Sequence, residues 1–129
     1  MQNKDTRPLS PHLQIYGWAV TMFMSTFHRI TGVAIVFGLM LVTAWLAMAS
    51  FSEDAWKLGQ AIFGHWFVIL VMMGWSATLF FHLCNGIRHL LADLTIGLAK
   101  GAASTTSWIA IFATAVVWLV FWIAIFAVK

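Results

Sequence analysis

Charged side chains are scarce in this sequence. Lysine, arginine, aspartate and glutamate together account for 9% of its 129 residues, whereas 62% of the residues are hydrophobic. Soluble domains carry roughly 25% charged and 45–50% apolar residues. A soluble core formed by a chain of this length cannot hide so much apolar surface. The composition therefore excludes a soluble globular domain and predicts an integral membrane protein.

Cysteine is nearly absent as well, because Cys84 is the single one in the sequence. One cysteine excludes an intrachain disulfide and a metal site built on cysteines, and the apolar stretch around Cys84 favours an inert, packed side chain.

The net charge of +3 is small and scattered along the chain, which argues against a nucleic-acid partner. Residues 1–13 lack the features of a signal peptide or an organelle presequence, so we expect the first membrane segment to direct insertion.

Three long stretches contain no lysine, arginine, aspartate or glutamate, and they are residues 30–52, 58–87 and 101–128. About 20 apolar residues cross a bilayer as a helix, so each stretch is long enough. The predicted transmembrane helices occupy about residues 32–51, 63–90 and 108–128. We expect one membrane domain over residues 1–129, with residues 1–28 as a segment on the inner face. The apolar residues within this segment fit either an interfacial helix or an early part of the first helix.

The positions of the basic residues predict the orientation of the chain. On one side of the membrane lie Lys4, Arg7, Arg29, Arg88 and Lys100; on the other lie Lys57 and Lys129. Because basic residues are enriched on the inner side, we expect the N-terminus inside and the C-terminus outside. Between the first two predicted spans, Ser52 followed by Glu53 and Asp54 is typical of a helix start.

The sequence HLCNGIRH, residues 82–89, places ionisable side chains near the end of the second predicted span. Each such side chain costs about 2.5–3.5 kcal/mol on insertion scales. One helical face carries His82, Gly86, His89 and Asp93. A neutral imidazole is a haem iron ligand, although an interhelical polar contact also fits His82. Gly86 leaves room for a flat group, and it equally fits close helix packing.

A second cluster lies near the start of the first predicted span. If helix is present by then, one face carries Ser25, His28, Arg29 and Gly32. A hydroxyl and a guanidinium one turn apart offer donors to a carbonyl or carboxylate, and a snorkelling arginine beside a serine is the other interpretation. Antiparallel neighbouring helices would bring both clusters to the same depth. Such a pocket suits a flat apolar ligand with anionic or carbonyl edges, and haem and quinone both fit.

The segments RPLSPHLQIY, STFHRITG and HLCNGIRHLLAD together resemble the cytochrome b556 membrane-anchor family of succinate dehydrogenase, the succinate:quinone oxidoreductase of respiratory complex II. The motifs span residues 7–93, and the three-helix layout covers the rest. The resemblance implies a helix bundle in which two anchor subunits with three helices each hold one haem b between them. It further implies a flavoprotein subunit that oxidises succinate and an iron-sulfur subunit that passes electrons to ubiquinone in the membrane. No activity of the isolated chain is expected.

The resemblance also implies how the haem is held. His82 corresponds to an axial ligand of the haem iron, and the partner anchor subunit would supply the second axial histidine. His28 and Arg29 correspond to residues near the haem propionates, where a cation offsets buried carboxylates. Ala92 departs from the family pattern, which often has a bulky residue just before the aspartate of the motif. This departure concerns local packing rather than iron ligation.

The quinone site follows from the resemblance in the same way. Ser25 and Arg29 correspond to the pair that binds and orients ubiquinone, while Leu13 and Trp18 match positions in the wall of the pocket. The remaining members of the motif, Arg88, His89 and Asp93, receive no role beyond contacts to propionates or to the subunit interface. The implied location is a bacterial inner membrane, with the mitochondrial inner membrane as the alternative.

Three other functions remain open at this point. The chain fits the anchor of a related fumarate reductase or a purely structural anchor without a redox role. A proton relay through His82, His89 and Asp93 is the third. It is the weakest, because three helices without an internal repeat make a poor transporter and the relay has no partner group at mid-depth.

Overall fold

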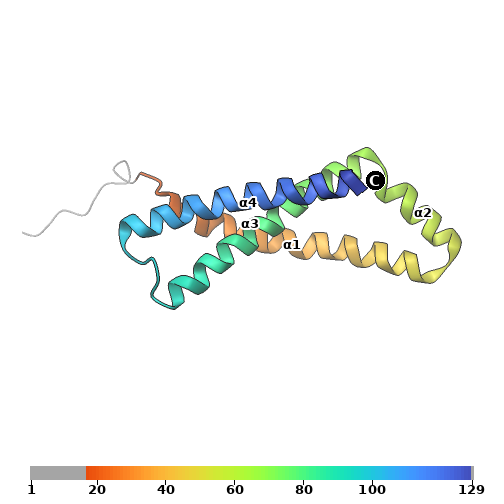
Figure 1. Cartoon of the computed structure of the whole chain (residues 1–129). Coiled ribbons are helices and arrows are strands. Elements are labelled where there is room, and N and C mark those ends of the chain that lie inside the picture. The colour runs from red at the N-terminus through yellow and green to blue at the C-terminus, as the bar shows by residue number, and fades with distance from the viewer. Residues whose placement is uncertain (1–16, 129) are drawn as a thin grey trace, which may run out of the picture.

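The computed structural model describes residues 17–128, which form four helices (Figure 1). They are α1 (Val20–Phe51), α2 (Glu53–Phe63), α3 (Trp66–Asp93) and α4 (Lys100–Val128). Three of these helices are long and apolar enough to cross a membrane: α1, α3, and α4 from Gly101 onward. The predicted all-α membrane fold with three spanning helices is therefore confirmed.

The helices differ from the predicted spans mainly at their beginnings. α1 begins at Val20, well ahead of residue 32, so the apolar residues from Val20 onward are an early part of the first helix. α4 begins at Lys100, ahead of residue 108. The second span was expected from about residue 63, but α2 ends at Phe63 and α3 begins at Trp66. His65 caps α3, since its Nδ1 accepts a hydrogen bond from the Phe67 N–H at 3.3 Å.

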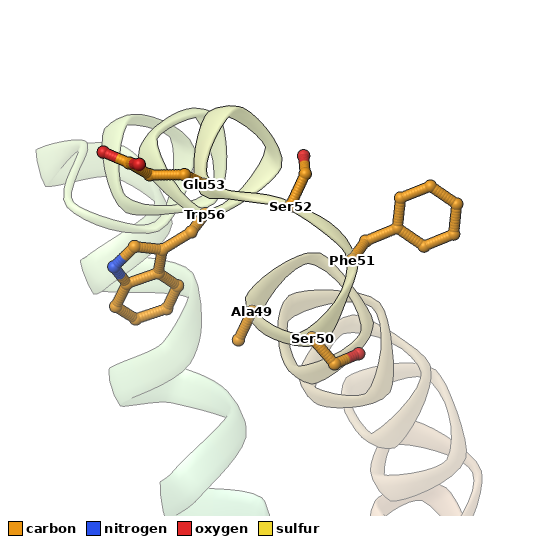
Figure 2. A pocket seen from close by; sticks show the side chains of 6 residues that line it. All are labelled: Ala49, Ser50, Phe51, Ser52, Glu53 and Trp56. Atoms are coloured by element: carbon orange, nitrogen blue, oxygen red, sulfur yellow. The ribbon is translucent and has the colours of Figure 1, made fainter.

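The connection between the first two membrane helices is itself the short helix α2. The Ser52 hydroxyl caps it by accepting from the Ala55 N–H at 3.1 Å, and Glu53 and Asp54 lie in its first turn, where the helix dipole favours acids. The helix start predicted at Ser52 is confirmed. Figure 2 shows the corner between α1 and α2, where a hollow of about 370 Å³ opens. Its lining residues are Ala49, Ser50, Phe51, Ser52, Glu53 and Trp56.

The interior of the described bundle is polar and its surface is apolar. The buried polar residues are Thr31, Ser76, Asn85 and Ser107, and the buried hydrophobic residues are Met24 and Ala110. Large apolar side chains cover the outside of all three long helices. This arrangement suits a membrane, because lipid tails are as apolar as leucine and helices associate through close packing and hydrogen bonds instead.

α3 packs against both α1 and α4, and these contacts are more extensive than the contact between α1 and α4. Figure 1 shows α4 beside α3, while α1 runs away from them toward α2. Trp118 on α4 donates its indole N–H toward the Met73 carbonyl at 3.0 Å and the Ser76 hydroxyl at 3.2 Å. Trp122 donates to the same hydroxyl at 2.9 Å. Ser76 therefore joins α3 to α4 through two indoles.

The contact between α1 and α3 depends on a glycine. Gly38 is buried on α1, and a methyl group added there would overlap the indole ring of Trp75 on α3. Glycine is common at such positions in membrane proteins because it lets helix backbones approach closely. This close approach helps to set the distance between α1 and α3 along α1 from the histidine cluster.

Candidate functional site

The two polar clusters predicted from the sequence lie at similar depth in neighbouring helices. His28 is about 12 Å from the start of α1 and His82 is about 17 Å from the end of α3, at 1.5 Å per helical residue. Because the helices run antiparallel, these ends lie on the same side of the bundle (Figure 1). The chain thus brings polar side chains together one third of the way into the helices.

The imidazoles of His28 and His82 stack on one another. Their ring centroids are 3.8 Å apart, with 13° between the ring planes. The ring of His89 lies 5.2 Å from that of His28 and is tilted by 54°. Three histidines from two helices therefore form one cluster, which includes two of the predicted haem-site residues.

The Nδ1 atom of His82 faces two hydrogen-bond acceptors. It lies 3.2 Å from the backbone carbonyl oxygen of His28 and 3.2 Å from the Thr31 hydroxyl. The Thr31 hydroxyl already donates its own proton to the His28 carbonyl at 3.0 Å. A carbonyl has no proton to give, so this surrounding favours the tautomer in which Nδ1 carries the proton. Nε2 of His82 is then left with its lone pair.

Two glycines shape the space around the stacked rings. A methyl group at Gly32 would lie 3.2 Å from Cε1 of His82, which is closer than ordinary packing allows. A methyl group at Gly86 would lie 3.9 Å from Cε1 of His28. In this chain Gly86 therefore faces an imidazole of the neighbouring helix, which agrees with the close-packing interpretation of that residue.

His28 has an unpaired polar atom. Its Nδ1 is buried and has no hydrogen-bond partner among the described residues. Leaving such a group unpaired costs about 1–3 kcal/mol, which a polar group of a bound ligand would offset. Within residues 17–128, no three histidine, cysteine, aspartate or glutamate side chains are placed to hold a metal ion together. A metal bound at this cluster would therefore take its remaining ligands from elsewhere, as in haem.

A second hydrogen-bonded group continues the cluster toward the end of α3. Asn85 is fully buried, and its side-chain amide donates to the Met24 carbonyl on α1 at 3.4 Å. The Arg88 Nε donates to the Asn85 side-chain oxygen at 2.9 Å. Asn85 therefore joins α1 to α3 and holds the Arg88 guanidinium near the histidines.

Thr31 and Asn85 were not singled out from the sequence, because neither is ionisable and neither was placed on the helical face predicted for its cluster. The available signals were the position of Thr31 one turn after His28 and the uncharged amide inside the motif HLCNGIRH. Both residues are buried, and both act by accepting or donating hydrogen bonds across the α1–α3 contact.

The residues predicted for the quinone lie apart from the stacked rings. Ser25 is half-buried and Arg29 is exposed, one turn apart on α1. Neither forms a hydrogen bond with another of the described residues. Trp18 precedes α1 and is 74% exposed, and Leu13 lies outside the described residues. Among residues 17–128, nothing covers Arg29 on this face of α1 or joins it to His82.

The hollow at the α1–α2 corner in Figure 2 is not a rival site. It lies at the opposite end of α1, roughly 30 Å from His28 at 1.5 Å per residue. Glu53 is the only charged residue in its lining, and it already pairs with Lys57 at 2.8 Å. The histidine cluster remains the candidate site.

Comparison with known proteins places the chain in a family of membrane subunits. Residues 3–121 match the family described as the succinate dehydrogenase/fumarate reductase transmembrane subunit. The chain belongs to this family. The match covers α1, α2 and α3 completely and much of α4, so it extends well beyond the three motifs that first indicated it.

Several relatives in this family carry the name of one enzyme. The succinate dehydrogenase cytochrome b556 subunit of Rickettsia felis is 31% identical over 119 residues, covering 92% of this chain and 93% of the relative. The subunit of the same name from Paracoccus denitrificans is 37% identical over 105 residues, covering 81% of each chain. The mitochondrial succinate dehydrogenase cytochrome b560 subunit of Bos taurus is 39% identical over 94 residues, covering 71% of this chain and 56% of the relative. The resemblance inferred from the motifs is therefore confirmed.

Proposed function

We propose that this chain is the cytochrome b anchor subunit of a succinate dehydrogenase and that Nε2 of His82 binds the iron of haem b. One observation carries the assignment to His82. Its Nδ1 faces the His28 carbonyl and the Thr31 hydroxyl, both at 3.2 Å, which leaves the Nε2 lone pair free. Metal-binding histidines nearly always donate their other ring N–H to an oxygen in this way.

The rest of the haem site requires a second subunit. One haem b, shared with a partner anchor subunit that supplies the other axial histidine, fits a chain in which no three described side chains are placed to hold a metal ion together. His28 and Arg29 are proposed to lie near the propionates, and the unpaired Nδ1 of His28 offers a polar contact there. The apolar outer surface of the three long helices supports burial against lipid and this partner.

Ubiquinone is the proposed substrate on the open face of α1. The Ser25 hydroxyl would donate a hydrogen bond to a quinone carbonyl, and the Arg29 guanidinium would stabilise negative charge that develops on the quinone oxygens. Leu13 and Trp18 would form part of the wall. An iron-sulfur subunit would deliver electrons that a flavoprotein subunit takes from succinate. When bound, haem b supplies a one-electron centre whose potential depends on its ligands and surroundings.

The proposed location is a bacterial inner membrane with the N-terminus on the cytoplasmic side. The support is the excess of basic residues on that side of the predicted spans. In this orientation the histidine cluster lies toward the cytoplasmic surface, where soluble subunits that oxidise succinate would dock.

The His82→Leu variant tests the haem assignment. Loss of the imidazole should abolish or greatly alter the b-type signal in a reduced-minus-oxidised absorption spectrum of the purified membrane complex. His65→Leu is the matched control, because His65 is an exposed histidine at the opposite end of the second membrane helix, and it should keep the signal. An unchanged six-coordinate spectrum in His82→Leu would contradict the assignment. Absence of haem from the unmodified complex would instead leave a purely structural anchor.

A further inference from the structure

We propose that Thr31 is a positioning residue that fixes the tautomer and the orientation of His82. This inference rests on the proposed binding of haem iron by His82. Thr31 is 5% exposed and lies on α1, whereas His82 is on α3. Their contact at 3.2 Å is thus a link between two membrane helices at the ring that would hold the metal.

The position of the threonine hydroxyl depends on a second hydrogen bond. Its proton is donated to the His28 carbonyl at 3.0 Å, so its lone pairs are the groups that face Nδ1 of His82. The hydroxyl and the carbonyl then share the Nδ1 proton between them. Two acceptors hold the ring plane more firmly than one, and Gly32 lets the ring approach α1 closely enough to reach both.

Loss of the Thr31 hydroxyl should change the redox potential of the haem. Acceptors on the distal ring N–H raise the basicity of a metal-binding imidazole. A more basic ligand favours ferric over ferrous iron, and ligand hydrogen bonding is one of the means by which a protein sets haem potential. Removing one of two acceptors should therefore shift the potential to a more positive value.

A threonine whose hydroxyl bonds only within its own helix should not affect the potential of the haem. Thr43 is such a residue, because its hydroxyl donates only to the Leu39 carbonyl in its own helix, at 2.8 Å, and it is exposed. Thr31→Val keeps the shape of the side chain and removes the hydroxyl. Thr31→Ser keeps the hydroxyl, and Thr43→Val is the matched control.

The experiment is a redox titration of the haem in the purified complex carrying each variant. Thr31→Val should raise the midpoint potential by up to about 59 mV. For a one-electron couple, this shift corresponds to a tenfold change in the equilibrium constant of reduction. Thr31→Ser should stay near the unmodified value, and Thr43→Val should not shift it. An unchanged potential in Thr31→Val, or an equal shift in Thr31→Ser, would overturn the proposal.

Three further outcomes are decisive. If Thr31→Val assembles without haem, retention of haem by Thr31→Ser supports the role of the hydroxyl, and loss in both variants contradicts it. If His82→Leu keeps a six-coordinate spectrum, the proposed ligand itself is wrong. If His82 is required while Thr31→Val is unchanged, the ligand stands and only the positioning role fails.

Discussion

Single residues in the α1–α3 contact show how polar groups are kept inside a membrane protein. Arg88 donates to Asn85, Asn85 donates to a backbone carbonyl of α1, and the Nδ1 of His82 faces two oxygen acceptors. Each of these contacts offsets part of the cost of removing a polar group from water. Ser25 and Arg29 differ, because no described residue satisfies them, and a bound quinone would supply that contact.

Replacement of Arg29 by alanine should therefore lower quinone reduction about tenfold or more, because a hydrogen bond to a charged group contributes ~1.5–3 kcal/mol. Replacement of Ser25 by alanine should lower it less, up to about tenfold, because a neutral hydrogen bond contributes ~0.5–1.5 kcal/mol. Succinate oxidation measured with a soluble dye should remain nearly unchanged, since the soluble subunits are untouched. Thr26→Ala is the control, because Thr26 is the exposed neighbour of Ser25 on α1. Equal losses in both assays would count against the quinone role.

Two pairs of neighbouring helices are held together by different kinds of contact. α3 and α4 share the hydroxyl of Ser76 between two indoles, whereas α1 and α3 approach closely at Gly38 and at Gly32. Neither kind of contact needs a large apolar core, which agrees with the polar interior of the bundle. The sequence predicted the helices themselves, but it did not single out Ser76, Trp118 or Trp122.

Ser76→Ala should weaken the pairing of α3 and α4. Trp122 loses its acceptor, while Trp118 retains the Met73 carbonyl. Interhelical hydrogen bonds in membranes contribute about 0.6 kcal/mol on average and about 1.7 kcal/mol at most. The complex in detergent should accordingly unfold at a lower temperature. Ser50→Ala is the control, since the Ser50 hydroxyl bonds only the Ala47 carbonyl within α1, and a similar decrease there would contradict the role of Ser76.

The bundle formed by residues 17–128 has an apolar surface around a narrow polar interior, and its histidine cluster lies nearer one end. The distribution of basic residues predicts that this end faces the cytoplasm. Thr95 in the turn after α3 and Asp54 in α2 are exposed and lie at opposite ends of the bundle. They are suitable reporters of orientation.

Single cysteines at these positions test the orientation in a background where Cys84 is serine. A membrane-impermeant thiol reagent added to intact spheroplasts should label Asp54→Cys and leave Thr95→Cys unlabelled. Inverted membrane vesicles should show the opposite pattern. Labelling of Thr95→Cys in intact spheroplasts would place the N-terminus outside and would move the proposed site away from cytoplasmic subunits.

Composition and hydropathy were sufficient to predict the membrane class and the three spanning helices, and the resemblance of three motifs predicted the family. These properties are local, because hydropathy depends on about 20 consecutive residues and one helical face depends on a spacing of three or four. The starts of α1, α3 and α4 were less predictable, since α1 and α4 include residues with small polar side chains ahead of the predicted spans, and Gly64 and His65 interrupt an apolar run. Ser25, His28 and Arg29 were found because they are ionisable or close to ionisable residues.

Only the tertiary structure decided which atoms meet. The stacking of His28 on His82 and the approach of Thr31 to Nδ1 join residues more than 50 positions apart. Such contacts depend on how far each helix is rotated and at what depth it crosses its neighbour. In a membrane, hydropathy does not set that rotation, because an apolar face gains little by turning inward. Small residues such as Gly32 and Gly38 and hydrogen bonds between helices set it instead.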